Sequence, residues 1–487
     1  MQDFNILKEL SFKYKSLPIY KVIPQNRLSP TQTFKILKNI SRHAFILESL
    51  EDEKNTGRYT FLGYSPKLEI SCKDGVLTIK NEDGVNTIDN ACPKEYIWKI
   101  INENRSPKLE ALPPFSGGLV GYFSYDFIKY SEKILKLDGE DIENFKDVDL
   151  MLFDKVIAFD NLEKKIFLIV NITTDDFEKS YDKALDELEK MSNLINNGEK
   201  ADIPKLKLTS SFRSLFDMKR YCVMVERAKR YIKEGDIFQV VLSNRLEADA
   251  EGSLFDTYEI LRKTNPSPYM FYFSSDMVEI AGASPETLVK LSGAKVSTFP
   301  LAGTRPRGRS RKEDKSLEKE LLLDPKELAE HNMLVDLGRN DIGKISKFGS
   351  VKVQKYLSII RFSHVMHIGS VVDGEIMEDK NALDAISAVL PAGTLSGAPK
   401  IRACEIIHEL EGSRRGIYGG AIGYISLTGD MDTCIAIRIA FKKDGKVYVR
   451  SGAGIVADSI PKNEFTECSN KAQAVISALK LAAKETE

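Results

Sequence analysis

The chain has 487 residues, which is enough for a large hydrophobic core and more than one structural layer. Lysine and arginine number 70 against 71 aspartate and glutamate residues, and this near-zero balance argues against nucleic acid as the main partner. Six cysteines without a CxxC pair indicate neither a zinc site nor a disulfide framework. There is no signal-peptide core and no apolar run long enough to cross a bilayer. We therefore expect a cytoplasmic protein without a membrane partner.

The first third of the chain is rich in short β-type runs. These runs lie at 43–51, 58–65, 67–72 and 76–81. Lys73-Asp74-Gly75 is a hairpin signal between the last two runs. A helix is predicted over Asp175 to Leu194, and the polar segment from Asn196 to Ser210 is interpreted as a linker. The chain is accordingly divided into an amino-terminal domain, 1–200, and a catalytic domain, 211–487.

Helices and strands mix after this linker. A helix over Met218 to Glu234 is expected to stop at Gly235, with a strand over 237–246 after it. The last helix is expected near Asn470 to Lys484.

One segment is echoed within the chain. GGLVGYFS at 117–124 is similar to GGAIGYIS at 419–426. Glycines in strands allow another backbone or a ligand to come close. Two halves built on related sheets would explain the similarity, and a chance match explains it nearly as well.

The segment PAGTLSGAPK at 391–400 lies between two helix-like stretches, 384–390 and 400–411. Small, turn-forming residues at a helix N-terminus expose backbone N–H groups, which suit an anion. A plain connection between helices is the alternative interpretation. A second Gly/Pro-rich loop is expected at 300–308, and Gly452 to Gly454 would form a third after a strand.

Two acidic pairs have the same spacing, Glu327 with Glu330 and Glu464 with Glu467. Residues three apart lie on one face of a helix. Four carboxylates on two facing helices could hold a hard cation such as Mg²⁺, which prefers oxygen ligands. The alternative for each pair alone is a solvated helix face. With only five histidines, a His-rich metal site is not expected.

Other charged residues are candidates for substrate contacts. Arg438 alternates with isoleucines in a predicted strand, 434–441, where it could bind a carboxylate or lie on the surface. His364 and His367 would point to opposite faces of a strand, so at most one could act as an acid or base in a shared site. A basic run begins at Arg305 without interleaved aromatic residues, which is not typical of a nucleic-acid site.

Together and in this order, these segments resemble the chorismate-utilising enzymes, most closely the large (component I) subunits of anthranilate synthases. The motifs that carry the resemblance are GASPE (282–286), PLAGTRPRG (300–308), ELAEHNMLVDLGRND (327–341), FSHVMH (362–367), PAGTLSGAPK (391–400), YGGAIGY (418–424), IAIR (435–438) and SGAG (451–454). In the amino-terminal part the matching motifs are ILES (46–49), GRYTFLG (57–63) and PFSGGLVGYFSYD (114–126).

The resemblance implies an α/β fold of two packed antiparallel β-sheets wrapped by helices. It also implies a Mg²⁺-dependent lyase of tryptophan biosynthesis. In that reaction ammonia adds to the ring of chorismate as the hydroxyl leaves, and elimination of pyruvate then gives anthranilate.

The family's functional residues transfer to matching positions. Glu286 would be the general acid, with His367, Thr394 and Gln239 in the same catalytic centre. Mg²⁺ would be held by Glu330 and Glu467, supported by Glu327 and Glu464. The residues expected to bind substrate are Gly303, Thr304, Tyr424, Arg438, Gly452, Ala453 and Gly454.

Two positions separate members of the family. Aminodeoxychorismate synthases, the second candidate, carry a nucleophilic lysine where this chain has Ala302. Isochorismate and salicylate synthases use a water-activating lysine where this chain has Gln239, which is no base at neutral pH. Both positions favour anthranilate synthase. A metabolite-sensing protein without activity is disfavoured by the intact acids at 286, 330 and 467.

Regulation and partners follow from the same resemblance. Feedback inhibition by L-tryptophan is expected at a separate site made of Glu48, Ser49, Asn265, Pro268, Tyr269 and Met270. A turn leading into a strand is the compatible alternative for the segment NPSPYM. Because no glutaminase motif is present, the chain alone should use ammonia. Use of glutamine would require a separate amidotransferase subunit (component II), in an expected heterotetramer.

Overall fold

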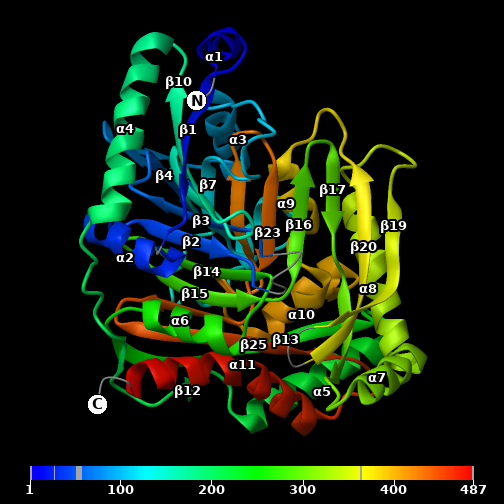
Figure 1. The fold of residues 1–487 in the computed structure, drawn as a ribbon. Coiled ribbons are helices and arrows are strands. Elements are labelled where there is room, and N and C mark those ends of the chain that lie inside the picture. The colour runs from blue at the N-terminus through cyan, green and yellow to red at the C-terminus, as the bar shows by residue number, and fades with distance from the viewer. Residues whose placement is uncertain (1–2, 27, 51–56, 362–364, 485–487) are drawn as a thin grey trace.

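The computed structural model describes residues 3–26, 28–50, 57–361 and 365–484. Two antiparallel β-sheets run through the molecule, and helices cover their outer faces (Figure 1). The predicted fold class is therefore confirmed. No helix within the described ranges is both long and apolar enough to span a membrane.

The first sheet has thirteen strands. Along its hydrogen-bonded path they are β1 (Ser16–Pro24), β10 (Lys165–Thr173), β9 (Lys155–Asp160), β3 (Tyr59–Tyr64), β2 (Ala44–Glu48), β14 (Tyr269–Ser274), β15 (Glu279–Ser284), β24 (Ile439–Lys443), β25 (Lys446–Ile455), β13 (Gln239–Glu251) and β11 (Lys207–Leu208), with β12 (Arg213–Ser214) and β21 (Gly397–Ala398) also paired to β13.

The second sheet has twelve strands. Its path is β18 (Leu301–Pro306), β20 (Val365–Glu375), β17 (Lys295–Thr298), β16 (Thr287–Ser292), β23 (Met431–Ile435), β22 (Ala421–Ser426), β7 (Gly118–Phe123), β8 (Val148–Phe153), β4 (Leu68–Lys73), β5 (Val76–Asn81) and β6 (Gly84–Ile88), with β19 (Lys352–Arg361) paired to β20. Both sheets contain strands from 1–200 and from 211–487, so the two halves of the chain share one framework.

The helices lie outside these sheets (Figure 1). They are α1 (Phe4–Ser11), α2 (Pro30–Ile40), α3 (Pro93–Glu103), α4 (Phe177–Asn197), α5 (Met218–Glu234), α6 (Phe255–Thr264), α7 (Arg311–Leu323), α8 (Pro325–Gly343), α9 (Ala382–Val389), α10 (Lys400–Glu411) and α11 (Pro461–Lys484), with 3₁₀ turns η1 (Tyr125–Tyr130) and η2 (Gly393–Leu395).

Local sequence signals explain several of these boundaries. Helix α5 has the predicted bounds because Asp217 caps its first turn and Gly235, in the left-handed conformation at φ 87°, ends it. The predicted hairpin joins β4 and β5 through Asp74 and Gly75, both with positive φ. Helix α11 begins at Pro461, nine residues before the predicted start, and therefore includes both carboxylates of the second acidic pair.

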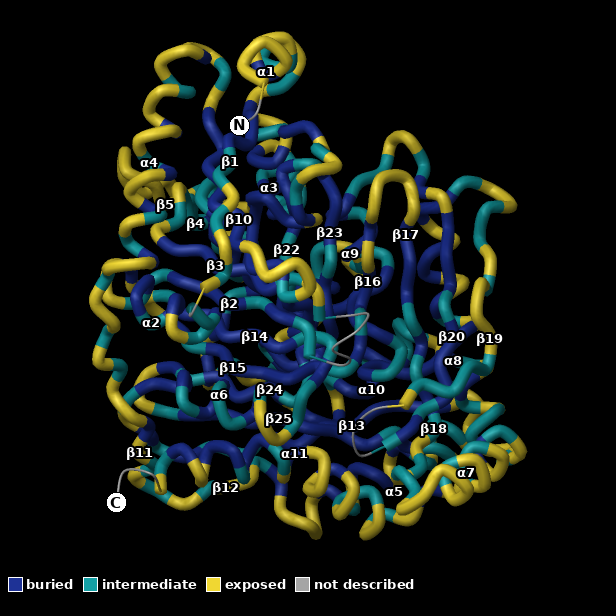
Figure 2. The backbone as a smooth tube through the Cα atoms, in the orientation of Figure 1, coloured by how far each residue is buried: buried dark blue, intermediate teal, exposed yellow. Residues whose placement is uncertain are grey.

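The core lies between the sheets and beneath the helices. One buried cluster joins Phe45 and Phe271 of the first sheet to Val120 and Cys434 of the second, so the two sheets pack face to face. Figure 2 shows the central strands buried, whereas the outer surfaces of α4 and α7 are exposed. This pattern is expected for helices that cover a two-sheet core.

Two neighbouring strands change sheets together. The chain leaves the first sheet after Ser284 and enters the second at Thr287, while β23 leaves the second sheet at Ile435 and β24 enters the first at Ile439. Hydrogen bonds tie the crossings, since Ile435 N donates to the Glu286 carbonyl over 2.9 Å. The predicted continuous strand over 434–441 is therefore wrong: the chain must turn between sheets, and Arg438 at the turn has φ 52°.

The echoed segments are adjacent strands. β7 and β22 pair antiparallel with Gly121 opposite Gly423 and Leu119 opposite Ile425. Equivalent positions in the two segments are thus related by a local two-fold arrangement through the glycine pair. A β-carbon at residue 121 would lie 2.1 Å from the carbonyl oxygen of Asp149 on β8. The glycine is therefore needed for close strand approach.

We predict that Gly121→Ala lowers the free energy of unfolding by at least about 2 kcal/mol, because the added methyl group forces β7 away from β8. Chemical denaturation followed by circular dichroism measures the change. Gly343→Ala is the matched control, since apart from the backbone of its own helix and its chain neighbours nothing lies within 4 Å of a β-carbon there. Equal stabilities of the two variants would contradict the steric argument.

Candidate active site

A cavity of about 560 Å³ lies beside the paired strand crossings. Its wall comes from β13, β18, β20, β25, η2, α8, α11 and the two crossings. The predicted site residues that line it are Gln239, Glu286, Gly303, Thr304, Glu327, Glu330, His367, Thr394, Arg438, Gly452, Gly454, Glu464 and Glu467. Residues spread over more than 200 positions thus converge on one space.

Glu286 lies in the crossing between β15 and β16 and is 8% exposed. Burial raises the pKa of its carboxyl to about 8, although the Thr394 hydroxyl, which donates to Oε1 over 3.1 Å, and the positive charges of Arg438 and Lys471 act in the opposite direction. The carboxyl is therefore mostly protonated at neutral pH. It can donate a proton to a group in the cavity.

His367 lies on β20 across the cavity. Its Nδ1 is 2.8 Å from the carbonyl oxygen of Gly303. A carbonyl can only accept, so Nδ1 carries the proton and Nε2 has the acceptor lone pair. Burial lowers the pKa of His367, and Arg438 and Lys471 lower it further, which outweighs the opposing effect of the Gly303 hydrogen bond. The ring is thus held neutral in a fixed orientation. His364, the alternative histidine, lies outside the described residues.

Arg438 is the principal cation at the crossing. It is half-buried, and burial lowers the pKa of its guanidinium while Glu286 acts in the opposite direction. A partly desolvated guanidinium on a residue in the left-handed backbone conformation is chemically suited to bind a carboxylate.

The glycines of SGAG lie within β25 rather than in a loop, which corrects the predicted loop at Gly452 to Gly454. The strand continues to Ile455 because Gly452 pairs with Ser243 and Gly454 with Val241 of β13. A β-carbon on Gly454 would lie 2.8 Å from the side-chain nitrogen of Gln239, so the glycine makes room for the Gln239 side chain in the cavity wall. No hydrogen-bond partner for Gln239 Oε1, which is buried in this wall, occurs within the described part of the chain.

The acidic pairs face the cavity from α8 and α11. Burial raises the pKa of Glu330, and the nearby carboxylates of Glu327 and Glu467 raise it further. Burial likewise raises the pKa of Glu464, and Glu467 adds to the effect. The two pairs therefore interact electrostatically across the helices, as expected for carboxylates that share a cation.

No three His, Cys, Asp or Glu side chains in the ranges that the structure describes are grouped closely enough to hold a metal ion. The donor set nevertheless fits Mg²⁺ in chemistry, because it consists of carboxylates that repel one another in a partly buried position. Lys471, one turn after Glu467 on α11, is 2.8 Å from its carboxylate and also lines the cavity.

Two predicted substrate contacts lie elsewhere. The side chain of Ala453 alternates away from the cavity into a fully buried core cluster. Tyr424 on β22 packs against Phe115 with the two rings tilted, and it lines a different pocket. Tyr418, six residues earlier in the same motif, lines the cavity instead. The motif alone does not tell which of its two tyrosines faces the cavity. That depends on the turn between Tyr418 and the start of β22 at Ala421.

Some charged side chains that line the cavity were not predicted from the sequence. They are Lys326, Arg450 and Lys471. Lys471 could have been found by helical period, since it lies four residues after Glu467 on the same face.

A second pocket of about 250 Å³ is lined by residues from strands of both sheets. Of the residues predicted for tryptophan, it is lined by Glu48, Ser49, Pro268, Tyr269 and Met270. Arg262 binds the Glu48 carboxylate, with Nε 2.6 Å from Oε1. Tyr269 donates to Asp432 over 2.7 Å. Phe61 and Tyr424 add aromatic walls.

Asn265 does not line this pocket. It faces a third cavity of about 580 Å³ that shares Arg438, Glu467 and Lys471 with the first. The loop preceding β14 therefore contributes to two sites, with Asn265 on one side and Pro268 to Met270 on the other.

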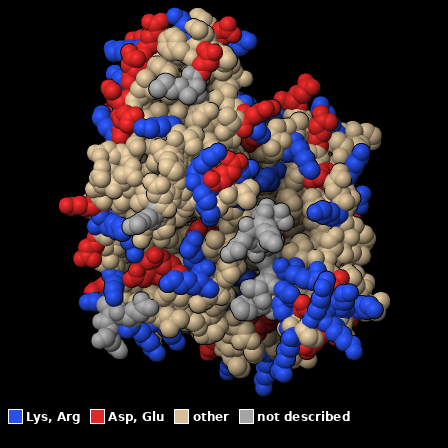
Figure 3. All heavy atoms as spheres, in the orientation of Figure 1, with Lys and Arg blue, Asp and Glu red and all other residues tan. Residues whose placement is uncertain are grey.

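The predicted basic run is largely neutralised. Arg305 pairs with Glu320 and Asp324, and Arg307 pairs with Asp314. Figure 3 shows lysine and arginine side chains gathered at the lower right, where α7 lies, with acidic side chains among them. The run therefore carries less net positive charge than its arginines alone would give.

Comparisons with known proteins agree with this geometry. A profile of the chorismate binding enzyme family matches residues 42–477. Anthranilate synthase component 1 of Acetivibrio thermocellus is 43% identical, with 97% of each chain covered. The corresponding protein of Aquifex aeolicus is 41% identical over 99% of this chain and 98% of its own. The crystal structure of anthranilate synthase component I from Streptococcus pneumoniae superposes with a TM-score of 0.75 at 40% identity, covering 86% of this chain and 92% of that one.

We predict that Glu286→Gln becomes more stable relative to the wild-type chain as pH rises from about 4.5 to about 8. The folded-state pKa is raised, so the stability that protonated Glu286 provides is complete at low pH and is lost as pH increases through the folded pKa. The difference in unfolding free energy should change by up to about 1.4 kcal/mol per pH unit. Denaturant titrations at several pH values measure it, and a pH-independent difference would contradict the protonated assignment.

Proposed function

The chain belongs to the chorismate binding enzyme family, and we propose that it acts as the large subunit of an anthranilate synthase. The proposed reaction converts chorismate and ammonia to anthranilate, pyruvate and water, with Mg²⁺ bound. This is the first reaction specific to tryptophan formation. A cytoplasmic location remains a prediction from composition.

The observation that carries this proposal is the chemistry of one cavity. It contains an acid with a raised pKa, Glu286, an arginine, and two acidic pairs, while Ala302 and Gln239 occupy the two positions that hold lysines in other members of the family. Alanine cannot form a covalent adduct, and glutamine cannot activate water. Ammonia arriving as a neutral nucleophile needs neither group.

The residues can be given roles in the reaction. The protonated carboxyl of Glu286 donates its proton to the departing ring hydroxyl, and the hydrogen bond from Thr394 fixes the carboxyl. Arg438 binds the carboxylate of the enolpyruvyl group, with backbone N–H groups of Gly452 and Gly454 beside it. The oriented ring of His367 assists pyruvate elimination through its acceptor nitrogen.

Glu330 and Glu467 would hold Mg²⁺, with Glu327 and Glu464 behind them. When bound, the ion neutralises and orients the ring carboxylate of the substrate. The side chains must close toward one another for this, and Glu467 must exchange its contact with Lys471. The mutual repulsion of the four carboxylates favours such a change when a cation arrives.

The proposed partner is a glutamine amidotransferase subunit in a heterotetramer. It would supply ammonia from glutamine by a shielded path. The basis is the naming of the relatives as component 1, which implies a second component.

The second pocket is proposed to bind L-tryptophan as a feedback inhibitor. Its volume of about 250 Å³ and its aromatic walls suit an indole side chain. The Ser49 hydroxyl offers an acceptor for an ammonium group, whereas the Glu48 carboxylate is already held by Arg262 and Tyr258. A ligand there would favour a conformation with poor affinity for chorismate.

We predict that the isolated chain, given chorismate, ammonium and Mg²⁺, releases fluorescent anthranilate. Accumulation of an aminated product that retains its pyruvyl group would favour aminodeoxychorismate synthase instead.

Glu330→Gln should weaken Mg²⁺ binding at least about ten-fold, because one anionic ligand is lost. Titration calorimetry measures this without turnover. Glu378→Gln, whose side chain is 94% exposed, is the control and should bind Mg²⁺ normally.

We also predict that Ser49→Phe abolishes inhibition by tryptophan, because the larger side chain fills the second pocket. Initial rates are measured against tryptophan concentration at fixed chorismate. Ser211→Phe, at an exposed position outside the pocket, should remain as sensitive as the wild-type chain. Unchanged inhibition of Ser49→Phe would place the inhibitor elsewhere.

A further inference from the structure

A fully buried charge cluster lies between α10, β13 and β25, and one of its members, Arg450, also lines the cavity. Its members are Glu411 at the end of α10, Arg415 in the following loop and Arg450 on β25. Their side chains are no more than 1% exposed. Buried ion pairs usually stabilise a fold little, since desolvation of the charges offsets their attraction. A fully buried triad with two cations therefore suggests a geometric role.

Arg415 uses its guanidinium as a clamp. Nε and Nη2 donate to the two carboxylate oxygens of Glu411 over 3.0 and 2.6 Å. Nη1 donates to the carbonyl of Leu395 over 2.6 Å, and Nη2 donates also to the carbonyl of Val241 over 2.7 Å. Leu395 and Val241 both line the cavity. One side chain thus joins two segments of the wall, and only the planar fork of arginine offers these directions together.

The Leu395 carbonyl, which accepts from Arg415, belongs to the residue next to Thr394, and Thr394 hydrogen-bonds to the proposed general acid Glu286. Leu395 ends the turn η2, in which the preceding residue, Thr394, donates to Glu286 Oε1 over 3.1 Å. The same turn is tied to β13 because Val241 N donates to the carbonyl of Ser396 over 2.9 Å. The guanidinium of Arg415 also lies 6.0 Å from the ring centre of Tyr418, another wall residue.

We propose that Arg415, held by Glu411, is a positioning residue that fixes Thr394 against the carboxyl of Glu286. The inference rests on the proposed function, in which Glu286 donates a proton. Arg415 lies behind the cavity wall and acts through the Leu395 carbonyl and the 3₁₀ turn.

The position of Thr394 affects the acid electrostatically as well as geometrically. The groups that face Glu286 are Thr394, Arg438 and Lys471, each of which opposes the burial that raises its pKa. When the Thr394 hydrogen bond is lost, the pKa of Glu286 rises further. The basic limb of the pH profile, where the acid loses its proton, then moves to higher pH.

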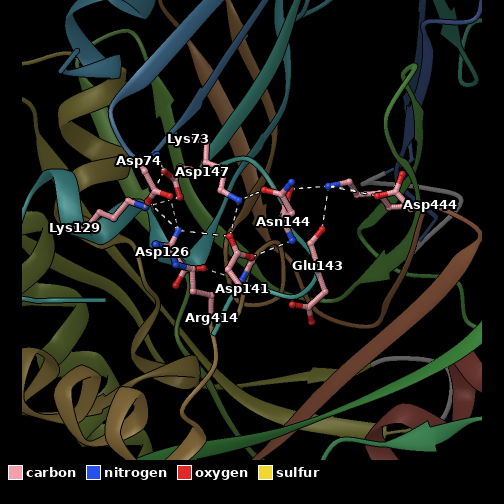
Figure 4. Close-up of polar contacts among 12 residues, drawn as sticks. Lys73, Asp74, Asp126, Lys129, Asp141, Glu143, Asn144, Asp147, Arg414 and Asp444 are labelled. Carbon is pink, nitrogen blue, oxygen red and sulfur yellow. Dashed lines mark hydrogen bonds and ion pairs between the residues drawn. The ribbon is translucent and has the colours of Figure 1, made fainter. Parts of the chain in front are cut away.

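The neighbouring residue provides a matched control. Arg414 binds the carboxylate of Asp74 on the β4–β5 hairpin and lies 3.7 Å from that of Asp141, in the polar cluster of Figure 4. That cluster contributes no residue to the cavity. Arg414→Gln therefore removes comparable ion pairs, one position away, without touching the wall.

The experiment compares Arg415→Gln with Arg414→Gln in the full chain, using chorismate, ammonium and Mg²⁺. For Arg415→Gln we expect kcat to fall at least about ten-fold, with a smaller change in KM for chorismate, and the basic limb of kcat/KM to move up. Arg414→Gln should keep the wild-type limb even if its melting temperature falls. Arg415→Lys should restore activity only in part, because an ammonium cannot replace the bidentate fork.

A double-variant cycle tests the route through Thr394. Thr394→Val alone should move the limb upward, and Arg415→Gln added to it should move the limb no further. An unchanged limb in folded Arg415→Gln, or a full additional shift in the Thr394→Val background, would overturn the proposal.

If Arg415→Gln does not fold, Glu411→Gln combined with Arg415→Met provides the measurement, since this pair leaves the cluster's net charge unchanged. It should show the same limb shift, and a wild-type limb would overturn the inference. A wild-type chain that makes no anthranilate would refute the proposed function itself, independently of any variant.

Discussion

The paired crossing of two strands between sheets is the constraint on which the site depends. β15 and β24 are hydrogen-bonded in the first sheet, and their continuations β16 and β23 are hydrogen-bonded in the second. Neither strand can change sheets without the other, because their backbone groups would lose partners in the core. Glu286 and Arg438 occupy the two crossings. Their proximity is therefore set by backbone pairing rather than by contact between their side chains.

The amino-terminal half contains a counterpart of this arrangement. β3 and β9 pair in the first sheet, and their neighbours in sequence, β4 and β8, pair in the second. The crossing sequence there, GYSPK at 63–67, matches GASPE at 282–286 in three positions. Lys67 replaces the acid, and Asp154 lies at the opposite crossing. Among the residues that the structure describes, none before Gln239 lines the cavity. The crossing at 282–286 differs from this counterpart in having α8 and α11 beside it, and both helices contribute to the cavity wall.

The sequence predicted the fold class and the membership of the cavity well, because short motifs carry both. The bounds of α5 and α10 follow from a cap and from terminal glycines, which are local signals. The strand through Arg438 was predicted wrongly, since alternating isoleucines look the same in one strand as in two strands on different sheets. Gly452 to Gly454 was predicted as a loop after the strand at 447–449, yet the strand continues through these residues, where the missing β-carbons allow Tyr418 and Gln239 to come close.

The positions of Tyr418, Tyr424 and Asn265 depend on tertiary structure that no local pattern specifies. Each belongs to a motif whose residues divide between two pockets. Tyr418 lines the first cavity and Tyr424 the second pocket, while Asn265 lines the third cavity and Pro268 the second pocket, so residues a few positions apart reach different sites. A motif can therefore identify a family while leaving open which of its residues touch a given ligand.

The electrostatics of the cavity follow from burial acting on groups of both signs. Burial raises the pKa of Glu286 and of Glu330 and lowers that of Arg438, so each group disfavours its own charged form. A substrate with two carboxylates and a divalent cation would bring the opposite charge to Arg438 and to the acidic helices. Glu286 is different, because Thr394 hydrogen-bonds to it while it remains protonated. The same burial that prepares the other groups for ligand charges thus keeps Glu286 protonated, as the proposed reaction requires, and in our proposal the contacts of Arg415 hold Thr394 against it.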